Sequence, residues 1–419
     1  PQALRILGPS RGPTARAGET LDGLPPSAVS LVSPAASGHE FVALSIEPIG
    51  GQTHSRAYGI NALGQVAARS SNWDDVGAVA VERQAFVWDP VAGSQALPTL
   101  DGESGVWDIN DDGFVSGYSF NDVALQHAVR WDIAPDPVTV TDLGTLVNAT
   151  TQVSGDTSTA YGLGPLGEAT GYSDLMNDAG DFPVFHAILY SDGSGLQDLG
   201  TLSTSYPQYQ NGYSISYSAN SAGQVVGTAH STEGAWHFRP FIYDAAGGLR
   251  ELTRAPAYAT TAYEWYAVAI NDAGLIGGHV IAAPDQSLPY YWPSETAEPL
   301  PVPMPTAYPY GEIYGINASG VMVGIMWNDL QEEHAFMYDA VNGVRDLNSL
   351  VDPAGGWVLE FARDINDQGQ IVGSGTLGGL VRGFVLTPAD LALSVGDVSI
   401  VEGDSGTTTL TFTVSLSFE

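Results

Sequence analysis

One short phrase returns seven times along this 419-residue chain, and its spacing limits the fold more than any single residue does. A clear copy is Ile60–Val66, and close copies begin at Ile109, Ile270, Ile316 and Ile365. Successive anchor glycines lie 46 to 56 residues apart. A period of about 50 residues is typical of β-propeller blades, so the repeat predicts that architecture. The anchors are Gly64, Gly113, Gly167, Gly223, Gly274, Gly320 and Gly369.

Each copy of the phrase, Ile-Asn-x-x-Gly, predicts a hairpin turn between two strands. Asparagine and glycine tolerate positive φ angles, which tight turns require. The flanking runs, such as Ala57–Ile60 and Gln65–Ala68, are short enough for strands.

Two further signals follow the turn in most repeats. The first is a five-residue segment that usually ends on an aromatic residue, as in Gln84–Trp88, His127–Trp131 and His334–Tyr338. Such a segment suits a strand with one face in a core. The second is an Asp-Leu-Gly phrase, as in Asp142–Leu146 and Asp198–Leu202. One repeat therefore predicts four strands.

Seven repeats of four strands predict an all-β fold, a seven-bladed β-propeller over residues 41–388. The last repeat lacks its fourth strand, and Phe41–Gly51 offers the missing piece at the other end of the chain. Pairing of the two ends would close the ring and leave few exposed sheet edges. Residues 1–40 are expected to form an extended arm or a processed N-terminus. An open β-solenoid is the alternative, although its coils are usually much shorter.

The ordered combination of the three signals resembles the HAF repeat of bacterial extracellular proteins. The resemblance covers residues 41–388, and the His-Ala-Phe triplet itself is intact at His334–Phe336. Near copies occur at His127–Val129 and His186–Ile188. The family implies secretion and a repeat architecture, and it implies no established reaction.

A second resemblance begins near residue 394, within the segment 389–419. Asp397–Thr407 followed by Thr409–Leu416 is similar to the start of a Calx-β domain. That family is a β-sandwich that often binds calcium, and only about two of its strands are present here. The resemblance implies that Glu402, with Asp404 nearby, is an acidic calcium ligand.

The composition limits the partners. The formal net charge is −34, and all 13 cationic residues are arginines. Such an acidic surface repels nucleic-acid phosphates and anionic lipid, so neither is expected as a partner. It suits calcium or high salt, or it simply keeps a secreted protein soluble. The absence of cysteine excludes disulfides and thiol chemistry, and no apolar run is long enough to predict a membrane span.

One segment has the opening of a calcium-binding loop. Asp108, Asn110 and Asp112 have the spacing of the first ligands of an EF-hand. The twelfth position holds Ser119, where a bidentate glutamate is needed. The same residues form the second copy of the repeat turn, so a turn and a Ca²⁺ site remain open alternatives.

Few residues suggest catalysis. His127, His186 and His334 share one repeat position, which favours a structural hydrogen bond to a neighbouring strand over metal binding. No nucleophile elbow or phosphate-binding glycine loop is present. A glycosidase with paired carboxylates stays open, because only their separation in space decides it.

The leading hypothesis is a secreted, non-enzymatic propeller that acts as an extracellular binding, adhesion or structural module for a protein or glycan. Four aromatic stretches could stack on sugars or anchor a partner, or they could pack between blades. They are Tyr206–Tyr217, Tyr258–Tyr266, Tyr290–Trp292 and Tyr308–Tyr314. The first alternative is a filament or surface-array subunit that self-associates through residues 1–38 and 394–419 by strand addition. The second alternative is a glycan-active hydrolase with an acidic pore.

Overall fold

A computed structural model describes residues 39–73, 80–148, 152–176, 183–202, 212–231, 237–259, 263–389, 391–395 and 414–418. The chain divides into two compact units, and the larger one runs from His39 to Leu391. The smaller one contains most of β29 (Leu391–Val395) and β30 (Val414–Phe418), which pair as a two-stranded sheet. Glu402 and Asp404 lie outside the described residues, as does the arm 1–38. Calcium binding there and self-association through these ends therefore stay predictions.

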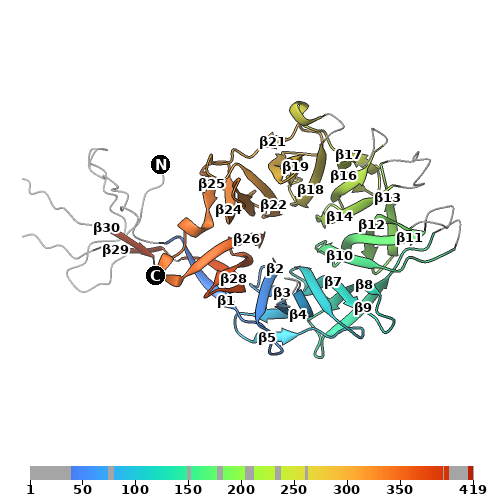
Figure 1. Ribbon diagram of the computed structural model, residues 1–419, viewed down its shortest axis with the longest axis horizontal. Coiled ribbons are helices and arrows are strands. Elements are labelled where there is room, and N and C mark those ends of the chain that lie inside the picture. Colours follow the sequence, from blue (N-terminus) through green and yellow to red (C-terminus); the bar gives the residue numbers. More distant parts are fainter. Residues whose placement is uncertain are drawn as a thin grey trace, which may run out of the picture. The chain divides into compact units, whose positions relative to one another are not determined.

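The larger unit confirms the predicted seven-bladed propeller, since its described strands form seven antiparallel sheets of four strands around a ring (Figure 1). The strands of blades 1–3 are β2 (His54–Ile60), β3 (Val66–Trp73), β4 (Ala80–Asp89), β5 (Gly93–Ala96), β6 (Ser104–Ile109), β7 (Phe114–Phe120), β8 (Gln126–Asp132), β9 (Thr139–Gly144), β10 (Ser158–Leu163), β11 (Ala169–Met176), β12 (Pro183–Ser191) and β13 (Gly195–Gly200). Those of blades 4–6 are β14 (Ser214–Ala219), β15 (Val225–His230), β16 (Phe238–Asp244), β17 (Gly248–Glu251), β18 (Glu264–Ile270), β19 (Ile276–Ala283), β20 (Gln286–Trp292), β21 (Leu300–Pro301), β22 (Tyr310–Ile316), β23 (Met322–Trp327), β24 (Glu333–Asp339) and β25 (Gly343–Asp346). Blade 7 consists of β26 (Trp357–Ile365), β27 (Ile371–Leu377), β28 (Leu380–Pro388) and β1 (Phe41–Ile46).

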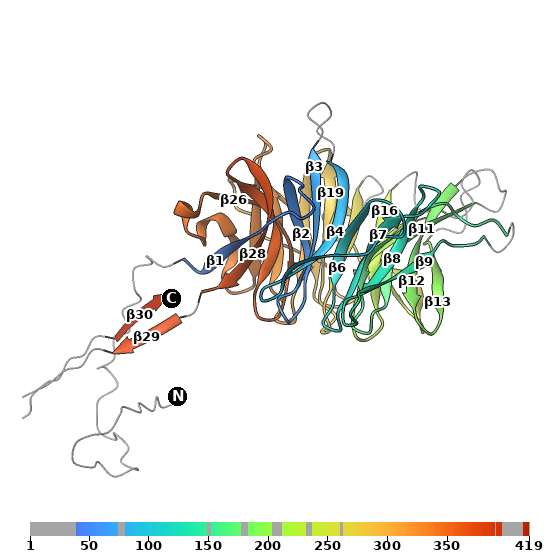
Figure 2. The same ribbon diagram turned by 90° about the horizontal axis from the view of Figure 1, so that it is seen from below.

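The N-terminal strand closes the ring, as predicted. β1 pairs antiparallel with β28, from Phe41 opposite Pro388 to Ile46 opposite Gly383 (Figures 1 and 2). This pairing covers the outer edge of the last blade, which would otherwise expose unpaired backbone groups.

The first strand of each blade is the innermost, and each contacts the first strand of the next blade around the whole ring. Large apolar side chains fill the space between blades. They come mainly from the aromatic segments of the third strands, where Phe86, Phe241, Phe336 and Phe384 are fully buried. Among the described residues, three short 3₁₀ helices occur in loops, at Pro256–Tyr258, Leu347–Ser349 and Pro353–Gly355. In the described part of the chain, no helix has the length and hydropathy to cross a membrane.

The repeat asparagine does more than form its turn. In blade 7, Asn366 Oδ1 accepts hydrogen bonds from the amides of Gln368 and Gln370, which confirms the predicted turn. Its Nδ2 also donates to the Asn61 carbonyl of blade 1, at 3.0 Å. Corresponding bonds link Asn61 to Asn110, Asn110 to Gly164, Asn220 to Asn271, Asn271 to Asn317, and Asn317 to Asn366. Blade 3 interrupts this ring, because Gly164 has no side chain to donate.

We expect Asn366→Asp to lower the free energy of unfolding by about 1–3 kcal/mol, because the change removes a buried donor and leaves the Asn61 carbonyl unpaired. The carboxylate can still accept the turn amides, so the turn itself is kept. Urea unfolding measures the effect. Asn121→Asp is the matched control, because Asn121 caps the same kind of turn with bonds from Val123 and Leu125 and makes no bond to another blade. Equal losses in the two variants would contradict a role for the ring of bonds.

The three repeated histidines are structural ties, as predicted. His127, His186 and His334 each place Nδ1 within hydrogen-bonding distance of the aspartate of the following Asp-Leu phrase. The partners are Asp142 at 2.9 Å, Asp198 at 2.9 Å and Asp346 at 2.6 Å. Each pair connects the third strand of a blade to its fourth strand. This contact explains why the two sequence signals occur together.

Candidate functional site

The first strand of every blade carries a β-bulge at the same place. In β2, Ala57 pairs with Ala68 and Gly59 pairs with Ala67, so Tyr58 is left unpaired between them. A bulge bends the strand and changes the direction of a side chain. The bulged position lies three residues before the asparagine position of the repeat turn. The seven bulged residues are Tyr58, Trp107, Tyr161, Tyr217, Val268, Tyr314 and Arg363.

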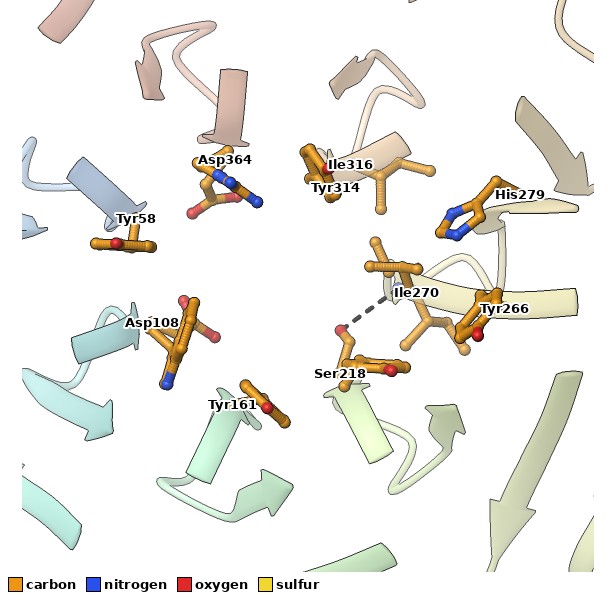
Figure 3. Close-up of a pocket in the computed structure, with 16 residues that line it drawn as sticks. Tyr58, Asp108, Tyr161, Ser218, Tyr266, Ile270, His279, Tyr314, Ile316 and Asp364 are labelled. Atoms are coloured by element: carbon orange, nitrogen blue, oxygen red, sulfur yellow. Dashed lines mark hydrogen bonds between the residues drawn. The ribbon is translucent and has the colours of Figure 1, made fainter. Parts of the chain in front are cut away.

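All seven bulged side chains line one cavity at the centre of the ring, which we call the central cavity. Its volume is about 370 Å³, within the usual range for small-molecule sites. Side chains from all around the ring surround its open centre (Figure 3). Ring centroids are 5.1 Å apart for Tyr58 and Trp107, 5.2 Å for Trp107 and Tyr161, and 5.7 Å for Tyr161 and Tyr217. Three tyrosines and one tryptophan therefore form a nearly continuous aromatic wall.

Two carboxyl groups also line the central cavity, each directly after a bulged residue. Asp108 accepts hydrogen bonds from the amides of Leu163, at 2.9 Å, and Ile109, at 2.8 Å. Asp364 accepts them from Ile60, at 2.9 Å, and Ile365, at 2.8 Å. Each carboxyl group thus connects its own first strand to the first strand of the next blade.

Both carboxyl groups hold their protons more tightly than usual. Burial raises the pKa of Asp108 to about 8, and the nearby charge of Asp364 adds to the shift. Burial also raises the pKa of Asp364. Two backbone hydrogen bonds oppose the shift at each group, because they stabilise the ionised form. The cavity therefore offers at least one protonated carboxyl group, a hydrogen-bond donor, near neutral pH.

The opposite side of the central cavity contains a buried polar cluster. Glu312 accepts hydrogen bonds from Tyr314 Oη, at 2.8 Å, and Ser287 Oγ, at 3.0 Å. His279 Nε2 lies 3.8 Å from Glu312, and the His279 ring stacks on Tyr266. Burial lowers the pKa of His279, so its ring is neutral at physiological pH. These groups present hydroxyl and imidazole edges across the cavity from the aromatic wall.

A second cavity of about 320 Å³ adjoins the first between blades 1, 2 and 3. The two cavities share Trp107 and Tyr161. The second one also contains two arginines, Arg69 of β3 and Arg83 of β4, in a protein of strongly negative net charge. Its character is therefore cationic as well as aromatic.

The three residues with EF-hand spacing have different positions and contacts in the structure. Asp108 lines the central cavity, and Asn110 donates its amide to the carbonyls of Gly164 and Pro165 in blade 3. Asp112 is exposed in the turn. Among the described residues, no group of three or more histidine, aspartate or glutamate side chains is placed to hold a metal ion. Calcium binding at this turn stays a prediction.

The described residues of the aromatic stretches noted in the sequence have two different roles, while residues 203–211 lie outside the part of the chain that the structure describes. Tyr217, Tyr266 and Tyr314 line the central cavity, whereas Tyr258 and Tyr290 pack in the core near blades 4 and 5. Sequence reasoning missed the bulged residues of blades 1, 2, 3, 5 and 7. The signal that could have found them is their shared position, which only an alignment of the seven repeats makes visible.

No protein-family model matches the chain, and no curated protein matches it. Solved structures are similar to the chain at low identity and with TM-scores below 0.5. Aleuria aurantia lectin, a point mutant with α-methyl-L-fucoside, has 9% identity and a TM-score of 0.40, over 74% of this chain and 96% of the lectin. YCF48 bound to a D1 peptide has 10% identity and a TM-score of 0.43, and the match covers 85% of this chain and 98% of YCF48. The extracellular domain of a candidate one-component system from B. thetaiotaomicron has 10% identity and a TM-score of 0.45. The match covers 83% of this chain but only 40% of that one. At these identities and TM-scores, the similarity carries no argument about a ligand or an activity of this chain.

Proposed function

We propose that the protein is a secreted, non-enzymatic binding module that holds a carbohydrate in the central cavity. The observation that carries the proposal is the bulge repeated in all seven blades, because it turns five aromatic side chains toward one small space. Tyrosine and tryptophan combine an apolar face with a polar edge, which suits a sugar ring bearing hydroxyl groups. The protonated Asp108 and the tyrosine hydroxyls supply hydrogen-bond donors.

The carboxyl groups support binding better than hydrolysis. A glycosidase needs, beside a carboxyl group that donates a proton, a second carboxylate whose oxygens are free to act as base or nucleophile. Here each oxygen of Asp108 and Asp364 already accepts a backbone amide, and the bonds to Leu163 and Ile60 join neighbouring blades. Because these bonds hold neighbouring blades together, they favour a structural role for the two carboxyl groups over a role as a reactive pair. The extracellular location is supported by the resemblance to HAF repeats.

Replacement of Tyr217 by alanine tests the proposal. A glycan array first identifies the oligosaccharide that the wild-type protein binds, and calorimetry then measures its dissociation constant. We expect Tyr217→Ala to weaken binding about tenfold, because one stacking face and its apolar contact are lost. Tyr310→Ala is the control, since Tyr310 lies on β22 and does not line the cavity.

Two outcomes would contradict the proposal. The first is that no glycan binds, or that Tyr217→Ala and Tyr310→Ala weaken binding equally. The second is turnover of the bound oligosaccharide, detected as new reducing ends after long incubation. Turnover that disappears in Asp108→Asn would support the hydrolase alternative instead.

A further inference from the structure

The second cavity joins two arginines to aromatic faces. Arg69 lies on β3 and places its guanidinium group 5.1 Å from the ring centre of Tyr58. In the described part of the chain, Arg69 makes no ion pair with a carboxylate. Most other arginines described here are paired, for example Arg130 with Asp192 at 2.7 Å. An unpaired arginine in a protein with a net charge of −34 is unusual enough to require a reason.

Nearby cations make the region more positive. Arg83, which also lines the second cavity, has only a loose contact with Glu103, 3.9 Å between nitrogen and oxygen. Arg56 lies opposite Arg69 in the pairing of β2 with β3. Burial lowers the pKa of Arg56 and the guanidinium groups of Arg69 and Arg363 lower it further, whereas Tyr58 and Glu360 raise it. Like charges held together in this way repel one another, and a bound anion would relieve the repulsion.

The remaining walls suit a sugar ring. Tyr161 and Tyr172 have ring centroids 5.9 Å apart, and Trp107 connects this cavity to the central one. Burial raises the pKa of Tyr161 to about 12, so its hydroxyl stays a neutral donor. Gln126 Nε2 donates to Thr159 Oγ1 at 2.5 Å and leaves its amide oxygen as an acceptor for a hydroxyl group.

From these contacts we infer that the second cavity binds the carboxylate of a hexuronate residue in an acidic glycan. The inference rests on the proposed carbohydrate-binding function and names its ligand class. A guanidinium group is planar and matches a carboxylate with two parallel hydrogen bonds, while the aromatic faces receive the pyranose ring. The acidic surface elsewhere does not prevent this, because charges more than about 8 Å away are largely screened at physiological salt. The shared Trp107 and Tyr161 allow one oligosaccharide to extend from the second cavity into the central cavity.

The test compares hexuronate oligosaccharides with the same molecules after methyl esterification, which removes the charge and keeps the sugar. Tetramers of galacturonate, mannuronate and glucuronate serve as probes in calorimetry at 0.15 M salt with EDTA, so that calcium cannot bridge acidic groups. We expect at least one tetramer to bind, and esterification to weaken its binding at least tenfold.

Variants locate the site. Arg69→Gln and Arg83→Gln should each weaken hexuronate binding about tenfold and leave the esterified probe unaffected, while Arg69→Lys should recover part of the loss. Arg254→Gln is the charge-matched control, because Arg254 pairs with Glu251 and lines neither cavity. Melting temperatures confirm that each variant folds.

Three results would overturn the inference. Equal binding of the charged and esterified tetramers would show that the carboxylate is not recognised. Binding of neutral glycans alone, still sensitive to Tyr217→Ala, would reject the hexuronate and leave the proposed function standing. No binding of any glycan would reject both.

Discussion

Replacing Gly324 by alanine is expected to lower the free energy of unfolding by about 3 kcal/mol, at the upper end of the cost of overpacking. Gly324 lies on β23, opposite the bulge of β22. A Cβ atom built there would lie 1.9 Å from the Glu312 carbonyl oxygen and 3.0 Å from Phe336. Because a backbone atom is in the way, no side-chain rotation relieves the clash. The inner strand would have to move, and with it the bulge that directs Tyr314 into the central cavity.

Urea unfolding measures this loss, and Gly193→Ala is the control, since nothing lies within 4 Å of a Cβ atom at Gly193. The same close approach recurs at Gly117, Gly171, Gly227, Gly278 and Gly373. Blade 1 has Ala68 at the equivalent position. A small loss in Gly324→Ala, equal to that in Gly193→Ala, would mean that the other blades can adopt the arrangement of blade 1 and that the glycine is not required.

The second large expected effect is on the pH dependence of the free energy of unfolding. Because the pKa of Asp108 rises from 3.8 to about 8 on folding, the folded protein binds the proton more tightly than the unfolded chain. The resulting stabilisation is complete below about pH 3.8 and is lost as the pH rises through about 8. Asp364 shifts in the same direction. Between pH 4 and pH 8, these two groups should therefore make the propeller progressively less stable.

Asp108→Asn isolates this contribution, since asparagine cannot ionise. Relative to the wild type, its free energy of unfolding should increase from about pH 4 to about pH 8 and then level off, apart from a constant offset for the altered hydrogen bonds. Urea unfolding at closely spaced pH values gives the difference. Asp112→Asn removes one exposed carboxylate from the adjacent turn and controls for net charge. Parallel curves for the wild type and Asp108→Asn would contradict the raised pKa.

Local sequence was sufficient for most of the fold. The Ile-Asn-x-x-Gly phrase predicts a turn because its asparagine and glycine satisfy the backbone within five residues, as the bonds at Asn366 show. The apolar segments around Phe86 and Phe336 predict buried third strands, and the structure buries consecutive residues of both, so these strands pack on two faces and not only on the one expected. Ring closure by β1 followed from counting strands, since the last repeat lacked one and Phe41–Ile46 was left over.

The candidate site was much less accessible to sequence reasoning. Asp108 was noted as part of a calcium loop, but its carboxyl group bonds to Leu163 of the next blade, 55 residues away. Arg69 and Trp107 had no motif to mark them. The aromatic residues of blades 1 to 3 stand in separate repeats, and each looks like an ordinary strand residue within its own segment.

The sequence by itself determined the number of blades, the strands within each blade and the turns between them, because these depend on contacts between residues close in the chain. Only the tertiary structure decided which side chains meet at the centre. That outcome depends on the bulge in each first strand and on closure of the ring by β1, which together bring Tyr58, Tyr217 and Arg363 into one cavity. Groups separated by hundreds of residues acquire shared chemistry there, since burial and neighbouring charge arise only when all seven blades are assembled.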